Sequence, residues 1–445
     1  MQRIKTLTHN GRRHLPLPSG PFSVGCCDIM TSYLKFGVFV RLFYPSKVQG
    51  VVERYLQWPE WIPHKEYVNG YAVRAGVPPK LYKMLFDLYV GKLYIPAIWQ
   101  AQLQPTDGKY PVIVFSHGLS GFRTTYSSIC LELASHGYVV AAVEHRDHSA
   151  SASFYKKQAR MSAFGSNPGS NLDEIDSLLN VPMEINWEDV VDSKWDPGPR
   201  IQDIGPFCHT KEWMLYLNPS KENEMSFRRQ QVRYRARECS EALDLLEDLN
   251  LGRSVTNILD ASFNASMFKD RLDLSNAFFI GHSFGGATGI LSLATELRFR
   301  AGVLLDPWMF PYFEDQHAFS MISQPFLCLL VQSFQTKQSM KVLKQLQNLH
   351  SFGEFVTLKK ANHRDLCDTP FVPKVSLSLS SKMGIRIGRF PALDLTVDLI
   401  LQFLGQQLGG SIKHESEKLE CLKEKFLVDE DFSSVDDEKT TCFNI

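Results

Sequence analysis

Short apolar segments alternate with helix-like segments over most of the chain, and this alternation limits the possible fold more than any other feature. Apolar runs typical of buried strands lie at residues 111–115, 138–143, 277–280, 301–305, 326–331 and 355–358. Residues with helical spacing lie at 126–135, 224–249, 287–297 and 394–408. Strands that alternate with helices predict a largely parallel sheet with helices on both faces. We therefore expect an α/β protein with a mostly parallel central β-sheet.

A serine turn directly follows one of these apolar segments. Residues 281–285 read Gly-His-Ser-Phe-Gly, and the glycine-rich residues that follow open a predicted helix. The G-x-S-x-G pattern alone is weak, because chance gives it in roughly one such chain in seven. Between a strand and a helix, however, it is the nucleophile elbow of the α/β-hydrolase fold. The alternative is a glycine-rich turn with a capping serine. We expect an α/β-hydrolase fold with Ser283 as the nucleophile.

A serine hydroxyl needs an imidazole to accept its proton, and the imidazole needs a carboxylate to orient it. In α/β-hydrolases the acid and the histidine follow the serine in that order, each after a strand. Asp306 directly follows an apolar segment, and His363 lies in the loop after the last one. The competitors are Asp315, which lies beyond two prolines, and His350, which precedes the last strand. The predicted catalytic residues are Ser283, Asp306 and His363.

Ester hydrolysis also needs two fixed N–H donors for the oxyanion that develops on the substrate. One donor is expected from Phe284, the residue after the nucleophile. The other is expected from Leu119, because the turn after an early strand supplies a donor in esterases. His117, in the same turn, is better explained as a hydrogen-bonded turn residue than as a catalytic group.

Charge and cysteine content exclude several other classes of protein. Lys+Arg and Asp+Glu each number 48, whereas a nucleic-acid-binding protein needs a net basic face. The 9 cysteines are scattered without C-x-x-C spacing, which argues against a disulfide framework or a zinc site. The Glu-His-Arg-Asp-His segment at 144–148 is interpreted as a buried polar network. We expect no metal, no cofactor and no nucleic-acid partner, and the oligomeric state is left open.

The two ends of the sequence lead to expectations about compartment and order. Residues 1–13 have no apolar signal region, and residue 2 is Gln rather than the glycine of N-myristoylation. A cytoplasmic protein with peripheral membrane contact is expected, and an extracellular location is the alternative. The chain ends in Cys-Phe-Asn-Ile, a poor prenylation signal.

One catalytic domain accounts for most of the chain. It is expected at residues 17–409, with a long surface insertion at about 160–225, where the alternation stops. Residues 1–16 are expected to form a flexible arm, and the charged residues 410–445 a disordered tail. The helix predicted at 224–249 carries an apolar stripe, with many arginines on its other face.

Longer strings of residues carry more information than the single motifs. They are Arg-Leu-Phe-Tyr-Pro (41–45), Phe-Ser-His-Gly-Leu (115–119), Ala-Ser-His-Gly (134–137), Val-Ala-Ala-Val-Glu-His-Arg-Asp (140–147), Arg-Ala-Arg-Glu-Cys-Ser (235–240), Gly-His-Ser-Phe-Gly-Gly-Ala-Thr (281–288) and Trp-Met-Phe-Pro (308–311). In this order they resemble the platelet-activating-factor acetylhydrolase family, which has plasma and cytosolic type II members. The resemblance covers about residues 17–405, with one interruption.

The resemblance implies a calcium-independent serine esterase that acts through an acyl-enzyme. Its substrates would be platelet-activating factor and related phospholipids with an acetyl or short, often oxidised, acyl chain at sn-2. It implies the same triad and the same oxyanion donors, Leu119 and Phe284. It also implies docking on a membrane or lipid-particle surface through a helix near residues 80–95 and through residues 368–373.

Residues 79–89 leave two interpretations open. Apolar side chains recur there at helical spacing, at Leu81, Met84, Leu85 and Leu88. Such a stripe belongs to the core or to an interfacial helix that dips into lipid headgroups. The function also has alternatives, namely a general carboxylesterase or lipase, and a non-catalytic hydrolase fold that binds lipid or protein.

Overall fold

The computed structural model describes residues 7–33, 37–158, 209–373, 387–410 and 417–429. The chain divides into two compact units, Met1–Phe154 with Trp213–Ile445, and Tyr155–Glu212. In the second unit only the ends of strands β9 (Ala152–Gln158) and β10 (His209–Leu215) are described. Most of the predicted insertion at 160–225 therefore lies outside the described residues, as do residues 1–6, 411–416 and the end of the predicted tail at 430–445.

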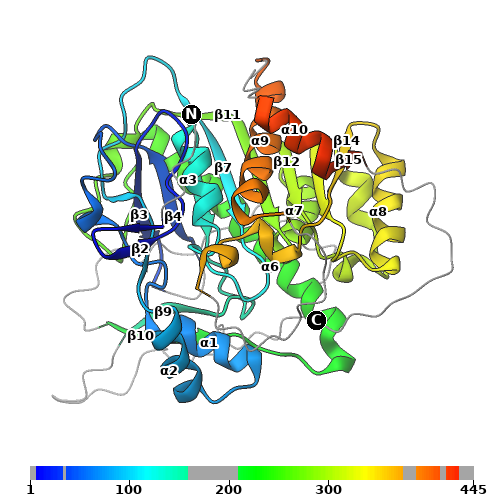
Figure 1. Ribbon diagram of the computed structural model, residues 1–445, viewed down its shortest axis with the longest axis horizontal. Coiled ribbons are helices and arrows are strands. Elements are labelled where there is room, and N and C mark those ends of the chain that lie inside the picture. The colour runs from blue at the N-terminus through cyan, green and yellow to red at the C-terminus, as the bar shows by residue number, and fades with distance from the viewer. Residues whose placement is uncertain (1–6, 34–36, 159–208, 374–386, 411–416, 430–445) are drawn as a thin grey trace, which may run out of the picture. The chain divides into compact units, whose positions relative to one another are not determined.

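A large sheet forms the centre of the first unit (Figure 1). Its described strands, in spatial order, are β15 (Leu427–Asp429), β14 (Gly353–Leu358), β13 (Phe326–Val331), β12 (Phe299–Leu305), β11 (Leu272–His282), β7 (Tyr110–Ser116), β8 (Val139–Val143), β4 (Phe39–Pro45), β3 (Val24–Met30) and β6 (Ile98–Trp99). Neighbouring strands from β14 to β8 pair in parallel, and β4 pairs antiparallel with both β8 and β3. The predicted mostly parallel sheet is confirmed.

Helices cover both faces of this sheet because successive strand side chains point to opposite faces. The helices described in the chain are α1 (Lys65–Ala75), α2 (Pro79–Tyr89), α3 (Ser127–Ser135), α6 (Glu224–Leu251), α7 (Phe284–Thr295), α8 (Lys337–Leu349), α9 (Arg389–Gln407) and α10 (Glu417–Phe426). In β7, Val112 and Val114 pack in one apolar cluster with α6, α7 and α8. Ile113 and Phe115 pack in the other apolar cluster, with α3 and α9.

Segments near both ends of the chain join this structure. Strands β1 (Thr8–His9) and β2 (Arg12–His14) lie within the predicted flexible arm, and β2 pairs with β5 (Leu93–Tyr94). Leu15 is fully buried, and its N–H donates to the Tyr94 carbonyl. Within the predicted tail, α10 is followed by β15, which pairs antiparallel with β14. Strands β1 and β2 have polar sequences and β15 has only three residues, so their order comes from tertiary contacts rather than from local pattern.

Short 3₁₀ turns complete the described part of the chain. They are η1 (Tyr55–Gln57), η2 (Lys221–Asn223), η3 (Ala265–Phe268), η4 (Phe310–Tyr312), η5 (His317–Met321), η6 (His363–Leu366) and η7 (Thr369–Phe371). None of the helices in the described ranges has both the length and the apolar character needed to cross a membrane.

Candidate active site

Ser283 lies at the sharp turn between β11 and α7. Its backbone has φ 58° and ψ −116°, a conformation that is strained for a residue with a side chain and typical of a nucleophile elbow. The flanking glycines are required by close approach, because a Cβ on Gly281 would lie 2.2 Å from the Gly285 carbonyl oxygen. A Cβ on Gly285 would lie 2.0 Å from the Ser116 carbonyl oxygen. The G-x-S-x-G spacing therefore has a steric cause.

The backbone of Ser283 is tied to the end of the neighbouring strand β12. The Ser283 N–H donates to the Leu305 carbonyl at 2.9 Å, and the Ser283 carbonyl accepts from the Trp308 N–H at 2.9 Å. Asp306 lies between these two partners, so the parallel pairing of β11 and β12 places the carboxylate residue beside the serine turn.

Asp306 and His363 form a hydrogen bond of 2.6 Å between Oδ2 and Nδ1. The other carboxylate oxygen accepts from the Val331 N–H at 3.1 Å and from Gln335 Nε2 at 2.6 Å. Because Nδ1 is the donor to the carboxylate, Nε2 of a neutral His363 carries the lone pair that can accept a proton. Phe334 stacks on the imidazole with ring centroids 3.6 Å apart and restricts its rotation.

The electrostatics of the pair suit a general base. Burial lowers the pKa of His363, with Arg364 adding to the effect, so the imidazole is neutral at neutral pH. Burial raises the pKa of Asp306, against the opposing hydrogen bonds from Val331 and Gln335. The fixed carboxylate compensates an imidazolium that forms when His363 takes a proton.

The two competing residues have other surroundings. His350 Nε2 donates to the Phe319 carbonyl at 2.7 Å, and its ring packs edge-on against Phe326. The Asp315 carboxylate accepts from the N–H of His317 at 3.0 Å, a local turn contact. Neither contact resembles that of a triad member.

The turn that carries Leu119 packs against the serine. A Cβ on Gly118 would lie 3.1 Å from Ser283 Cβ, so the backbone there approaches the nucleophile closely. The Gly118 carbonyl accepts from the Gly121 N–H at 2.9 Å and from His117 Nδ1 at 2.8 Å. In a planar trans peptide the N–H points opposite to the C=O, so these two donors fix the direction of the Leu119 N–H. Phe284 opens α7, where backbone N–H groups have no partner within the helix.

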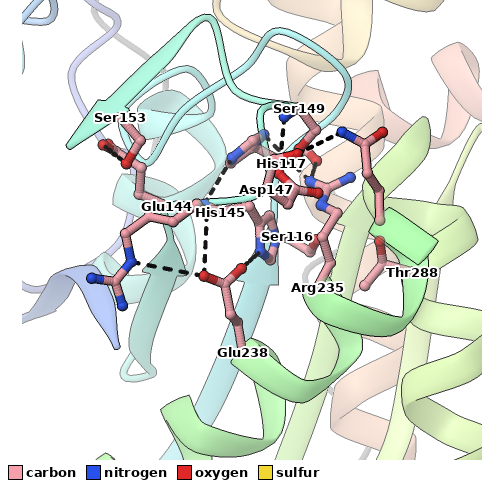
Figure 2. Close-up of polar contacts among 12 residues, drawn as sticks. Ser116, His117, Glu144, His145, Asp147, Ser149, Ser153, Arg235, Glu238 and Thr288 are labelled. Carbon is pink, nitrogen blue, oxygen red and sulfur yellow. Dashed lines mark hydrogen bonds and ion pairs between the residues drawn. The ribbon is translucent and has the colours of Figure 1, made fainter. Parts of the chain in front are cut away.

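A buried arginine holds the same turn from the other side. Arg235 of α6 is fully buried, and its Nη2 donates to the His117 carbonyl (Figure 2). Its guanidinium lies 4.6 Å from the centroid of the Phe284 ring. The prediction that arginines of this helix lie on the face opposite its apolar stripe is wrong for Arg235 and also for Arg228, which is 1% exposed. Helical spacing alone does not predict that these two arginines are buried, because it does not show which groups hydrogen-bond to them.

Beneath the turn, the 144–148 segment joins a network of polar side chains (Figure 2). Ser116 Oγ lies 2.8 Å from His145 Nε2, and His145 Nδ1 lies 2.6 Å from Glu238 Oε2. This serine–histidine–glutamate set is fully enclosed, with side-chain exposures of 0% for His145 and 4% for Glu238. It gives no substrate access and fixes the loop after β8 to α6.

A strand-to-helix serine, an acid after the adjacent parallel strand and a histidine bonded to that acid define an α/β hydrolase. A solved ferulic acid esterase from Streptomyces cinnamoneus has a similar fold, with a TM-score of 0.53 and 16% identity, covering 91% of this chain and 97% of that one. The family model described as "Platelet-activating factor acetylhydrolase, isoform II" matches residues 7–427. The chain belongs to the platelet-activating factor acetylhydrolase family.

Named relatives are similar to this chain in sequence over most of their own length. Platelet-activating factor acetylhydrolase of Cavia porcellus is 34% identical over 412 residues, which is 92% of this chain and 82% of the relative. That of Gallus gallus is 35% identical over 409 residues, 92% of this chain and 86% of the relative. A putative phospholipase A2 of Schizosaccharomyces pombe is 27% identical, over 80% of this chain and 82% of the relative.

Proposed function

We propose that this chain is a serine esterase that hydrolyses the sn-2 acetyl or short acyl ester of platelet-activating factor and related phospholipids. Its membership of the acetylhydrolase family and the names of its relatives support this substrate class. The single observation that carries the proposed chemistry is the 2.6 Å hydrogen bond between Asp306 and His363. Asp306 directly follows β12, the strand that pairs with β11 and so lies beside the serine elbow.

The proposed mechanism proceeds through an acyl-enzyme. His363 Nε2 takes the proton of Ser283 as Oγ attacks the sn-2 carbonyl, and Asp306 stabilises the imidazolium. The N–H groups of Leu119 and Phe284 hold the oxyanion. The imidazolium then protonates the leaving lysophospholipid, and water repeats the sequence to release the acid. Because these groups supply both the base and the oxyanion donors, we propose that the reaction does not depend on calcium.

A fluorophosphonate reagent is expected to modify Ser283, since this reagent captures a serine activated by an adjacent base. Peptide mass spectrometry should locate the adduct on that residue, and an excess of platelet-activating factor should slow its formation.

Hydrolysis should fall steeply as the sn-2 chain is lengthened from acetyl to long acyl. An absence of labelling would favour a non-catalytic hydrolase fold. Equal hydrolysis of simple esters and long-chain lipids would favour a general carboxylesterase or lipase.

We also propose that α2 docks on the lipid surface that holds the substrate. Phe86 points into the core at 8% exposure, whereas Leu81, Met84 and Leu88 are 46%, 59% and 69% exposed. The three exposed side chains recur at helical spacing, so they share one outward face, as in interfacial helices. In the second segment implied by the resemblance, Phe371 is buried, so the proposal rests on α2.

Replacing both Met84 and Leu88 with serine is expected to weaken binding to phosphatidylcholine vesicles about tenfold or more. Each side chain loses apolar surface that would enter the headgroup region, at about 25 cal/mol per Å². Vesicle co-sedimentation measures the change, and the unfolding temperature should stay near that of the parent protein. The matched control is Leu297→Ser, at a side chain 74% exposed and outside α2. Equal vesicle binding by the control and the double variant would contradict the proposal.

A further inference from the structure

A chain of three hydrogen bonds joins the Leu119 turn to the backbone of His363. The Gly118 N–H donates to the Tyr126 hydroxyl oxygen at 3.0 Å. The Tyr126 hydroxyl lies 2.7 Å from His282 Nδ1. His282 Nε2 lies 3.1 Å from the carbonyl oxygen of His363. His282 is the residue between Gly281 and Ser283, so the hydrogen-bond chain runs through the residue directly before the nucleophile.

The hydrogen bonds of this chain have only one consistent direction. The His363 carbonyl can only accept, so His282 Nε2 carries the proton. A neutral imidazole carries one N–H, so His282 Nδ1 accepts and the Tyr126 hydroxyl donates to it. The hydroxyl oxygen in turn accepts from Gly118. Burial lowers the pKa of His282 well below its usual value, with the nearby His363 adding to the effect, which favours this neutral form.

The two ends of this hydrogen-bond chain are attached to the general base and to the oxyanion turn, whose separation matters for the proposed reaction. One end is the backbone of the residue that takes the serine proton. The other is the peptide between His117 and Gly118, whose carbonyl is held by Arg235. That peptide precedes the one that carries the Leu119 N–H. A shift of about 1 Å between base and oxyanion donor can reduce a rate about 10²-fold, so a rigid link between them has a direct kinetic consequence.

We propose that Tyr126 and His282 are positioning residues that hold the general base and the oxyanion turn at a fixed separation around Ser283. This inference rests on the proposed function of the triad and adds two residues to it. The Tyr126 ring has a separate role, because it is 5% exposed and packs against Phe115 with centroids 5.0 Å apart. The positioning role belongs to the hydroxyl group, which can be removed while the ring stays.

The test is Tyr126→Phe, with Tyr44→Phe as the matched control. Tyr44 is also buried, and its hydroxyl donates to the Ala101 carbonyl at 2.8 Å in another part of the core. We expect Tyr126→Phe to lower kcat on a short-acyl phospholipid about 10- to 100-fold with little change in KM. The control should keep kcat within about twofold while losing similar thermal stability. A Tyr126→Phe enzyme with the kcat of the control would overturn the proposal.

A double-variant cycle separates a shared link from two independent packing effects. His282→Phe removes both of its hydrogen bonds and retains an aromatic ring. If the two residues act through one chain, the double variant should have a kcat close to that of the more impaired single variant. Losses that multiply would show that the residues act separately, and the proposal would fail.

A third measurement determines the tautomer of His282 in the parent protein itself. In ¹⁵N-histidine-labelled protein, His282 should give the signal of the Nε2–H tautomer, assigned by its loss in His282→Phe. A signal from the Nδ1–H tautomer would reverse the chain and overturn the inference. The proposed function itself is tested apart from this. If Ser283→Ala is inactive and Tyr126→Phe is unimpaired, only the positioning role is wrong, whereas an active Ser283→Ala protein would contradict both.

Discussion

Ser283→Ala is expected to lower turnover of a short-acyl phosphocholine lipid by at least about 10³-fold. The alanine variant has no oxygen to attack the sn-2 carbonyl, so the acyl-enzyme cannot form and His363 has no proton to accept. In the proposed mechanism the remaining rate would come from attack by water, with the N–H groups of Leu119 and Phe284 still available to the oxyanion. Release of the acyl chain, followed under saturating lipid, measures the loss.

The control for this experiment lies on the same helix. Ser292 of α7 is a fully buried serine, whereas Ser283 is 8% exposed, and Ser292→Ala removes the same hydroxyl from a position beyond the elbow. Its turnover should remain within about threefold of the parent value, since surrounding packing is otherwise unchanged. Full hydrolysis by Ser283→Ala, or equal losses in the two variants, would show that the elbow serine is not the nucleophile.

Most of the fold follows from local patterns in the sequence. Continuous apolar runs predict strands that are buried on both faces, and segments such as 111–115 and 326–331 do form interior strands of the sheet. A common site for Ser283, Asp306 and His363 could be predicted because each residue follows a strand. Parallel strands bring their carboxyl ends to the same edge of the sheet. Their catalytic roles remain predictions until variants are measured.

The supporting residues were harder to predict because their partners are distant in sequence. Gln335, which holds the Asp306 carboxylate, is 29 residues away from it and has no motif around it. Arg235 did carry a signal, since it lies three residues after Val232 and four before Cys239 on the apolar stripe of α6. A charged residue at a core position of a helix indicates a buried partner, here the His117 carbonyl.

Helical spacing could not decide which side of α2 meets the core. Leu81, Met84 and Leu88 form a stripe that fits either a core helix or an interfacial one. Only the tertiary structure shows that Phe86 takes the inward position and leaves the stripe exposed. The short strands β2 and β15 near the ends of the chain could not be predicted for a related reason, because pairing with β5 and β14 orders them.

The second large effect is expected on stability, from replacement of Arg123 by methionine. Arg123 is 4% exposed, and its guanidinium bonds Asp28 at 2.8 Å, Glu144, and the Tyr67 hydroxyl at 2.6 Å. Arg41 supplies the other positive charge, at 2.6 Å from Asp28. Two arginines and two carboxylates balance in this buried network. Methionine fills much of the volume but leaves one buried negative charge without compensation.

We expect Arg123→Met to lower the free energy of unfolding by about 3–5 kcal/mol, the usual cost of removing one member of a buried ion pair. Urea denaturation followed by tryptophan fluorescence gives the difference. The matched control is Arg298→Met, where the arginine is 39% exposed and bonds Asp244 and Glu296. That change should cost about 1 kcal/mol or less, because exposed pairs contribute little.

The pH dependence of the difference distinguishes the lost ion pairs from a simple packing defect. Burial alone would raise the pKa of Asp28, but Arg123 and Arg41 outweigh it, so the pKa lies below the value of about 3.9 in an unfolded chain. The ionised carboxylate therefore stabilises the fold above about pH 4, and this contribution is lost as the pH falls toward the folded-state pKa. In Arg123→Met the ionised Asp28 carboxylate contributes less to the free energy of unfolding already at neutral pH, because one of its two arginine partners is missing. The stability gap between parent and variant should narrow below about pH 4, whereas a gap that is constant with pH would assign the loss to packing.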